Sequence, residues 1–146
     1  MNTNIKTNTV ENVHSVLSAL NHGRILEALD AFDDQFTFID KALGLEFTDK
    51  ERLTEFFQKL GEDFPDTVVE VISTFESEDQ VIAEWKINAN RKIAYLGQQQ
   101  QIPISFQGIS VVRMENGRIT HWSDYYDSNK SWRCSLAAFF TDWIEI

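Results

Sequence analysis

An acidic and aromatic stretch near the C-terminus, GRITHWSDYYD at 117–127, constrains the fold of this chain most strongly. An apolar run precedes it, and Asn116-Gly117 lies between the two, a dipeptide that favours the positive φ angles of a type I′ turn. The two runs are therefore predicted to form an antiparallel hairpin. By alternation, one face of the second strand carries Thr120, Trp122, Asp124 and Tyr126, and the other carries Ile119, His121, Ser123 and Tyr125.

Asp124 is unusual within such a strand, because Asp is disfavoured in strands and is rarely buried without a partner. One explanation is an edge strand whose acid faces water, and this strand taken alone slightly favours it. The other is that Asp124 points into an aromatic-lined cavity, where loss of hydration would raise its pKa. The rest of the chain favours the cavity.

Composition and net charge limit which kind of protein this is and which partners it can bind. The 146 residues, 42% hydrophobic and 25% charged, predict one globular domain spanning 1–146. A net charge of −10 argues against a nucleic-acid partner and against binding to an anionic membrane surface. There is no signal-like or membrane-spanning apolar run, and Cys134 is the single cysteine, so we expect a cytoplasmic protein without an intrachain disulfide.

The first half of the chain predicts mainly helices. Residues 1–8 are expected to form a flexible tail, followed by a helix that Thr9 caps and a second short helix over 25–34. A capping box at Thr48–Glu51 predicts a third helix, which Gly61 ends. Between the second and third helices lies a short strand, 36–40, one face of which carries Phe36, Phe38 and Asp40.

The second half predicts strands at 67–76, 80–90, 101–114 and 118–126, with a polar hairpin tip at 98–101. In the second of these strands, the inward positions are Val81, Ala83, Trp85, Ile87 and Ala89.

Gly108 lies where the alternation of the third strand shifts from Ile104 and Phe106 to Ile109 and Val111. This shift predicts a β-bulge, which would bend the sheet and make one face concave. The final segment, 128–146, is expected to form an amphipathic helix and tail that dock on the body or on another copy, through Trp132, Leu136, Phe139, Phe140 and Trp143.

Early helices followed by curved strands predict an α+β fold. We expect a cone-shaped α+β barrel, in which the N-terminal helices pack on a strongly curved, mostly antiparallel sheet. A conical cavity would lie between the two layers, lined by the acidic and aromatic faces of both acid-bearing strands.

The order of these elements, with the pieces FTFID at 36–40 and GRITHWSDYYD at 117–127, resembles the nuclear transport factor 2-like superfamily. The resemblance is greatest to its SnoaL-like branch of polyketide cyclases, and ketosteroid isomerases belong to the same superfamily. The second piece also resembles the strand of limonene-epoxide hydrolases on which a Trp and an Asp face the pocket. The resemblance implies that Trp122 and Asp124 face the cavity, and that the other side of the sheet forms a homodimer.

The chain departs from the epoxide-hydrolase pattern at the remaining site positions. That pattern needs an Arg and an Asp on the preceding inward-facing strand, where this chain has Trp85 and Ile87. Its Tyr and Asn on the first strand would fall at Phe38 and Asp40. Epoxide hydrolysis by that mechanism is therefore disfavoured.

Within the cavity, Asp124 is the first choice for a general acid or base, and Asp40 is the second. Two carboxyl groups facing one cavity push each other's titration apart. The predicted substrate-binding residues are Trp122, Trp85, Tyr126, Phe38 and Phe106, and the N–H or O–H groups of the first three could hold a carbonyl or enolate oxygen. Core packing explains Trp85 and Phe38 equally well. His121 lies three positions from Asp124, hence on the opposite strand face.

Two functions remain open from the sequence. The first is an enzyme that moves a proton next to a carbonyl in a small apolar molecule, giving isomerisation, cyclisation or hydration. No metal or cofactor is expected, because the chain has neither a Gly-rich phosphate loop nor a Cys/His cluster. The alternative is a non-catalytic module that binds a hydrophobic ligand or dimerises, with its aspartates satisfied structurally.

Overall fold

One six-stranded sheet carries the site, with strand order β2-β1-β6-β5-β4-β3. The computed structural model describes residues 4–127, so the helix predicted for 128–146 lies outside the described residues. Its strands are β1 (Phe32–Asp40), β2 (Leu45–Phe47), β3 (Val68–Ser77), β4 (Gln80–Tyr95), β5 (Gln98–Glu115) and β6 (Arg118–Tyr126). Its helices are α1 (Asn4–Asn21), α2 (Ile25–Leu29) and α3 (Lys50–Asp63).

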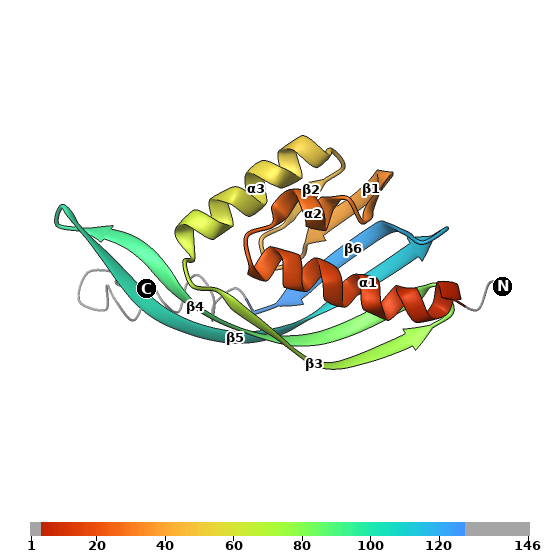
Figure 1. Cartoon of the computed structure of the whole chain (residues 1–146). Coiled ribbons are helices and arrows are strands. Elements are labelled where there is room, and N and C mark those ends of the chain that lie inside the picture. Colours follow the sequence, from red (N-terminus) through yellow and green to blue (C-terminus); the bar gives the residue numbers. More distant parts are fainter. Residues whose placement is uncertain (1–3, 128–146) are drawn as a thin grey trace.

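The sheet is mixed but mostly antiparallel, because β1 and β6 are the only pair among its described strands that runs in parallel. Figure 1 shows the long strands curling beneath the three helices, which cover the concave face. The predicted α+β fold with helices on a curved sheet is confirmed, but the sheet is curled rather than closed into a barrel. Its two edges are β2 and β3.

The first helix begins earlier than the sequence pattern predicts. It starts at Asn4, so residues 4–8 are helical rather than part of a tail, and Thr9 lies inside the helix instead of capping it. Its apolar stripe faces the core, where Val13 and Val16 are buried. Among the described residues, no helix is long and apolar enough to cross a membrane.

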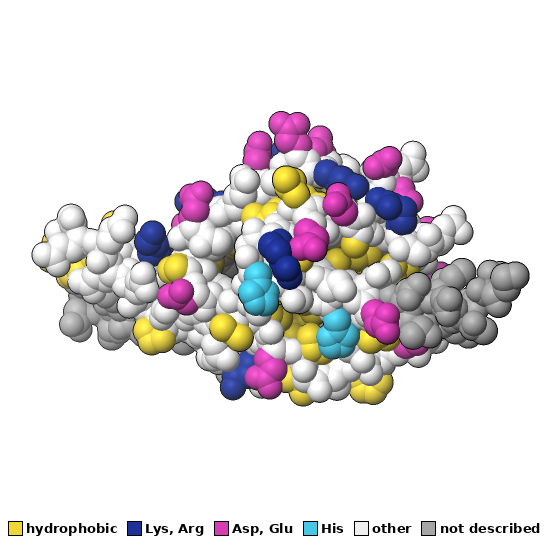
Figure 2. Space-filling view, viewed as in Figure 1, with side chains coloured by type: hydrophobic (Ala, Val, Ile, Leu, Met, Phe, Trp, Pro, Cys, Tyr) yellow, Lys and Arg dark blue, Asp and Glu magenta, His cyan; other side chains and the backbone are white. Residues whose placement is uncertain are grey.

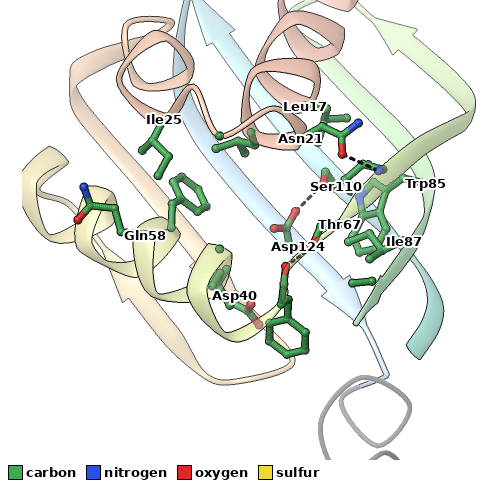
Figure 3. Close-up of a pocket in the computed structure, with 18 of the residues that line it drawn as sticks. Leu17, Asn21, Ile25, Asp40, Gln58, Thr67, Trp85, Ile87, Ser110 and Asp124 are labelled. Carbon is green, nitrogen blue, oxygen red and sulfur yellow. Dashed lines mark hydrogen bonds between the residues drawn. The ribbon is translucent and has the colours of Figure 1, made fainter. Parts of the chain in front are cut away.

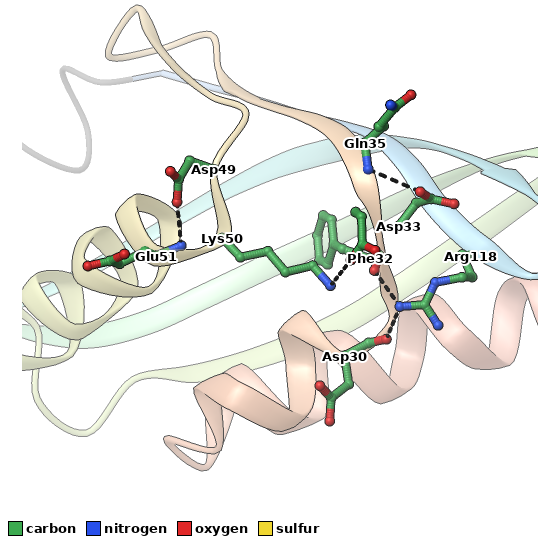
Figure 4. Close-up of polar contacts among 9 residues, drawn as sticks. Asp30, Phe32, Asp33, Gln35, Asp49, Lys50, Glu51 and Arg118 are labelled. Atoms are coloured by element: carbon green, nitrogen blue, oxygen red, sulfur yellow. Dashed lines mark hydrogen bonds and ion pairs between the residues drawn. The ribbon is translucent and has the colours of Figure 1, made fainter.

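The second helix is shorter than predicted, because it ends at Leu29 and β1 already begins at Phe32. The Ile119 N–H donates to the carbonyl of Ala31, and the Arg118 guanidinium donates to the carbonyls of Asp30 and Phe32 (Figure 4). Pairing with β6 thus places residues 32–34 in a strand, although their local pattern favours a helix.

The cap of α3 is Asp49 rather than Thr48. Its carboxylate accepts from the backbone N–H of Glu51 at 2.7 Å (Figure 4). It also accepts from the backbone N–H of Arg52 at 3.3 Å, so two donors of the first turn are satisfied. The helix also continues through Gly61 to Asp63 instead of ending at the glycine.

Positive φ angles mark the turns at both ends of β5. Asn116 and Gly117 have φ angles of 54° and 79°, as the predicted type I′ turn requires. The other tip lies at Leu96-Gly97, with φ angles of 51° and 75°, so the stretch predicted as a tip, 98–101, belongs to β5.

Gly108 does not mark a bulge, because the register of β4 against β5 runs through it without interruption. Ile104, Ser110 and Val112 are buried on the concave side, whereas Ile109 is 38% exposed on the other. A Cβ at Gly108 would lie 2.5 Å from the Trp85 ring and 2.6 Å from the Tyr125 carbonyl oxygen. The glycine therefore provides the space in which the indole of Trp85 lies across the neighbouring strand.

The irregularity of this hairpin lies instead at Thr120. Arg113 pairs with His121 and Met114 pairs with Ile119, so Thr120 is an extra residue on β6. The prediction placed Ile119 on the same face as His121, away from Trp122. Because of the extra residue, Ile119 instead lies fully buried in the core with Met114. Beyond the bulge, Trp122, Asp124 and Tyr126 share the concave face as predicted.

Charges on the helix-covered side of the molecule are scattered. Figure 2 shows acidic and basic side chains interspersed over this side, with apolar side chains between them. No single-sign patch marks a nucleic-acid surface on the face shown there.

Candidate functional site

A cavity of about 790 Å³ lies between the concave sheet face and the helices α1 and α3 (Figure 3). The structure brings all seven residues predicted from the sequence to its wall: Phe38, Asp40, Trp85, Phe106, Trp122, Asp124 and Tyr126. Their chemical roles remain predictions. Sequence reasoning missed other polar residues of the lining, among them Ser110, Asn21 and Thr67.

Strand register brings the polar groups of the site together. Asp124 of β6 pairs with Asp40 of β1 on one side and with Ser110 of β5 on the other. Neighbouring strands lie about 4.8 Å apart, so these three side chains project into the cavity side by side. Two acids from segments far apart in the sequence are thus held at neighbouring positions by backbone pairing.

The Asp124 carboxyl accepts two hydrogen bonds on the same oxygen. Ser110 Oγ lies 2.5 Å from its Oδ1, and Trp122 Nε1 donates to that atom at 2.7 Å. Trp85 Nε1 in turn donates to Ser110 Oγ at 2.8 Å. A line of hydrogen bonds therefore crosses β4, β5 and β6 and ends at Asp124.

Burial raises the pKa of Asp124 to about 7. Loss of hydration is the largest cause, because the charged form is disfavoured among aromatic side chains. The hydrogen bonds from Ser110 and Trp122 stabilise the charged form and oppose this rise, while the negative charge of Asp40 adds to it. Asp124 remains partly exposed, and it lines the cavity.

Asp40 is bonded differently, since both of its oxygens accept hydrogen bonds. The Leu43 N–H donates to Oδ1 at 2.9 Å, and the Tyr126 hydroxyl donates to Oδ2 at 2.7 Å. Burial raises the pKa of Asp40, and these bonds, with one from the Ala42 N–H, oppose the rise. Asp40 is 4% exposed as a residue and Asp124 is partly exposed, so Asp40 has less access to a ligand than Asp124 has.

The donors of the aromatic wall are used within the protein. The indole of Trp85 donates to Ser110, that of Trp122 to Asp124, and the phenol of Tyr126 to Asp40. In this arrangement these groups donate to protein acceptors, and a role in holding a ligand's carbonyl or enolate oxygen stays a prediction. Their flat faces remain as walls.

Aromatic rings fill the two ends of this wall. Trp85, Phe106 and Tyr126 form one cluster, with ring centroids 5.3 to 6.2 Å apart. Phe38 stacks on Trp122 at 6.4 Å and packs edge-on against Phe57 at 5.4 Å. Phe38 and Trp122 belong to the buried core, so they support the cavity as much as they line it.

The cavity wall carries no positive side chain among the described residues. Its acids are the buried Asp40, the partly exposed Asp124 and the exposed Glu62 and Asp66. Arg91 lies over the outer part of this region with its guanidinium 4.9 Å from the Phe64 ring, but it is not part of the wall. The field inside the cavity is therefore negative or neutral.

His121 lies on the opposite side of the sheet from Asp124, as the strand geometry predicts. Its Nε2 lies 2.6 Å from Ser123 Oγ. Burial, followed by the charges of Arg113 and Lys41, lowers the pKa of His121. Within residues 4–127 there is also no group of three or more His, Cys, Asp or Glu side chains arranged to hold a metal ion.

Ser110 escaped prediction because of the shift inferred at Gly108. That shift assigned Ile109 and Val111 to the concave face and so turned Ser110 outward. Had the alternation of Ile104 and Phe106 been continued, it would have placed Ser110 on the cavity side, two positions beyond the glycine. The uninterrupted even-numbered pattern was the available signal.

Solved structures share this fold at low sequence identity. A protein designated a polyketide cyclase from Xanthomonas campestris pv. campestris matches with a TM-score of 0.79 and 15% identity, covering 90% of this chain and 98% of that one. One designated a SnoaL-like polyketide cyclase from Shewanella denitrificans has a TM-score of 0.77 and 14% identity, covering 89% and 97%. These likenesses establish the fold and not the reaction.

A third structure is a protein of ketosteroid isomerase-like fold from Catenulispora acidiphila, in complex with trimethylamine. Its TM-score is 0.76 at 19% identity, covering 86% of this chain and 92% of that one. No curated protein matches the chain. The model of the SnoaL-like domain family matches residues 13–122, a range that begins within α1 and ends within β6, two residues before Asp124. The chain therefore belongs to the SnoaL-like domain family, within the nuclear transport factor 2-like fold.

Proposed function

We propose that this protein is a small-molecule enzyme that uses Asp124 for general acid/base chemistry, of the isomerase or cyclase type. The observation that carries the proposal is the Asp124 carboxyl itself. Among the described residues it accepts hydrogen bonds through one oxygen only, it faces an aromatic cavity, and its pKa is raised to about 7. A carboxyl poised near neutrality can both accept and return a proton at physiological pH.

The chemistry that fits this group is proton transfer at a carbon next to a carbonyl. Ionised Asp124 takes the proton, the electron pair of the C–H bond passes into an enolate, and the protonated acid returns the proton to the same or another atom. Isomerisation follows if the atom differs, and cyclisation follows if the enolate carbon attacks a second carbonyl within the molecule. No external oxidant or reductant is required.

The substrate class follows from the wall of the cavity. Trp85, Phe106 and Tyr126 offer flat apolar surface, and no described wall residue offers a positive charge to an anion. We therefore infer an apolar, uncharged carbonyl compound or ring system that fits within the cavity.

Substitution of Asp124 by Asn tests this function on a panel of cyclic and aromatic ketones, followed by hydrogen–deuterium exchange at the carbon next to the carbonyl. The wild type should catalyse exchange or turnover of at least one compound, and Asp124→Asn should lose it by about 100-fold or more. Asp79→Asn, at an exposed turn acid, is the matched control and should retain it. Full activity of a folded Asp124→Asn protein would refute the assignment.

A second candidate is a ligand-binding module without turnover. The observation in its favour is that three aromatic donors satisfy the acids and serine of the cavity internally. Aromatic faces beside carboxylates also suit a cationic amine, and the relative from Catenulispora acidiphila is in complex with trimethylamine. Calorimetric binding of alkylammonium ions by a protein that exchanges no substrate protons would favour this function.

We also propose that the outer sheet face forms a homodimer. Ile109 and Tyr125 pair across β5 and β6 on that face and are 38% and 42% exposed. Sedimentation equilibrium should give a dimer for the wild type, and Ile109→Glu should shift it to the monomer. A wild type that sediments as a monomer would refute the proposed dimer.

A further inference from the structure

We propose that Ser110 is a positioning residue, which the Trp85 indole orients so that its hydroxyl donates to Asp124 Oδ1 and leaves Oδ2 as the oxygen that exchanges protons with a ligand. The inference deepens the function proposed for Asp124 and rests on it. It is carried by the direction in which each hydrogen bond of the network must run.

The two ends of the network fix its direction. An indole N–H can only donate, so Ser110 Oγ accepts from Trp85 at 2.8 Å, and Asp124 Oδ1 accepts from Trp122 at 2.7 Å. The single hydrogen between Ser110 Oγ and Oδ1, 2.5 Å apart, then belongs to the serine. An Oδ1 that carried its own proton would be a poor acceptor for the Trp122 N–H.

Oδ1 therefore behaves as the carbonyl oxygen when Asp124 is neutral, and the acid proton resides on Oδ2. No described residue donates a hydrogen bond to Oδ2, and Asp124 faces the cavity. Asp40 presents the contrasting case, because the Leu43 N–H and the Tyr126 O–H occupy both of its oxygens. Only one of the two carboxyl groups thus keeps an oxygen for a ligand.

The position of Trp85 depends on a neighbouring residue without a side chain. Trp85 pairs with Gly108 across β4 and β5, and a Cβ there would lie 2.5 Å from the indole ring. The ring thus lies across the next strand, where its N–H reaches Ser110 two residues further along β5. A cross-strand Trp–Gly pair and an inward Ser together set the direction of the hydroxyl.

The first test measures the Asp124 pKa by carboxyl ¹³C NMR in a double-mutant cycle of Ser110→Ala and Trp85→Phe. Ser110→Ala should raise the pKa by about 0.5–1 unit, because one donor to the charged form is lost. Trp85→Phe should raise the Asp124 pKa in the wild-type background more than it does in the Ser110→Ala background, because the indole acts through the Ser110 hydroxyl. Ser105→Ala, at an exposed position of the same strand, is the matched control.

Two results would overturn the proposal. The first is an unchanged Asp124 pKa in Ser110→Ala. The second is an equal effect of Trp85→Phe with and without the Ser110 hydroxyl, which would mean that the indole acts by packing alone. Should Trp85→Phe fail to fold, Ser110→Ala decides with the measurement below.

The second test locates the proton by infrared spectroscopy of protein labelled with ¹³C-aspartate, below the Asp124 pKa, with Asp124→Asn to assign the band. A carbonyl Oδ1 that accepts two hydrogen bonds should absorb at low frequency and shift upward in Ser110→Ala. A band typical of an unbonded carbonyl, indifferent to that substitution, would contradict the assignment. Neither test needs substrate, so this network can hold even if turnover survives Asp124→Asn, a result that would refute the proposed function alone.

Discussion

Two carboxyl groups at paired strand positions differ here in the hydrogen bonds that their oxygens receive. Asp40 has a donor on each oxygen, one from the backbone and one from a phenol, and these two bonds hold its carboxyl in place. Asp124 has two donors on one oxygen and none from the described residues on the other. The two acids are therefore not equivalent, because among the described residues only Asp124 has a carboxyl oxygen that receives no hydrogen bond.

The raised pKa of Asp124 makes stability depend on pH. Between the unfolded value of 3.8 and the folded value of about 7, the folded protein holds a proton that the unfolded chain has lost. Stability should therefore fall as pH rises from about 4 to about 7, by at most about 4 kcal/mol, and then level off.

Asp124→Asn removes this dependence, because its amide mimics the neutral acid. Compared with the wild type by urea unfolding, the variant should gain in relative stability between pH 5 and pH 8. A stability difference that stays constant over this range would contradict a raised pKa.

At the level of elements, the sequence predicted best where local signals agree. The β5–β6 turn follows from Asn116-Gly117, and the bounds of β6 follow from its alternation. Ends fixed by distant contacts were missed: β1 captures Phe32 through pairing with β6, and β2, at Leu45–Phe47, is too short to show a pattern. The bulge was placed at Gly108 instead of Thr120, because a glycine in a strand indicates either a bulge or a close approach.

The aromatic and acidic residues of the site were predicted from the sequence, but the hydrogen bonds that connect them were not. Composition shows which side chains line a concave face, but the direction of a tryptophan N–H depends on rotamers that only packing decides. The sequence therefore allowed Trp85 to be a cavity-lining residue or a core residue equally well. No local sequence pattern indicated its hydrogen bond to Ser110.

The close approach at Gly108 predicts a large cost for any side chain there. Gly108→Ala should destabilise the fold by about 3 kcal/mol, because the added Cβ would overlap both the Trp85 ring and a backbone carbonyl. Gly61→Ala is the matched control, since its Cβ would meet nothing within 4 Å inside α3, and it should stabilise by about 0.5–1 kcal/mol. Thermal and urea unfolding measure both, and similar midpoints for the two variants would disprove the tight contact.

The cap of α3 provides a second prediction at this scale. Asp49→Ala should cost about 1 kcal/mol, because two backbone donors of the first turn lose their acceptor. Thr48→Ala should cost much less, as no side-chain cap bond from Thr48 is present in the described structure. Urea unfolding of both variants distinguishes the two residues, and a larger loss for Thr48→Ala would restore the capping box predicted from the sequence.

On the scale of the whole molecule, the charges around the cavity select against anions. The described wall carries acids and no base, and the chain has a net charge of −10. A carboxylate ligand would have to leave water without gaining a partner.

We therefore expect cyclohexanecarboxylate to bind at least 10-fold more weakly than a neutral cyclohexyl ketone of similar size, by quenching of tryptophan fluorescence at pH 8. The expected ratio corresponds to about 1.4 kcal/mol, less than the cost of burying an unpaired charge. Equal affinities would mean that a positive group outside the described wall reaches the ligand.

The parallel pairing of β1 with β6 also bears on how the chain folds. The strand order divides the sheet into the β1–β2 hairpin and the β3–β4–β5 meander, and β6 is the strand that joins them. Each piece can form from neighbouring residues, whereas the joining contacts, such as Asp40 with Asp124, close a loop of more than half the chain. Because loop closure is slow for distant contacts, the joining step should come late. During synthesis, the β1–β2 hairpin and the β3–β4–β5 meander would therefore form before the cavity does. The cavity would close when β6, which carries Asp124, pairs with both.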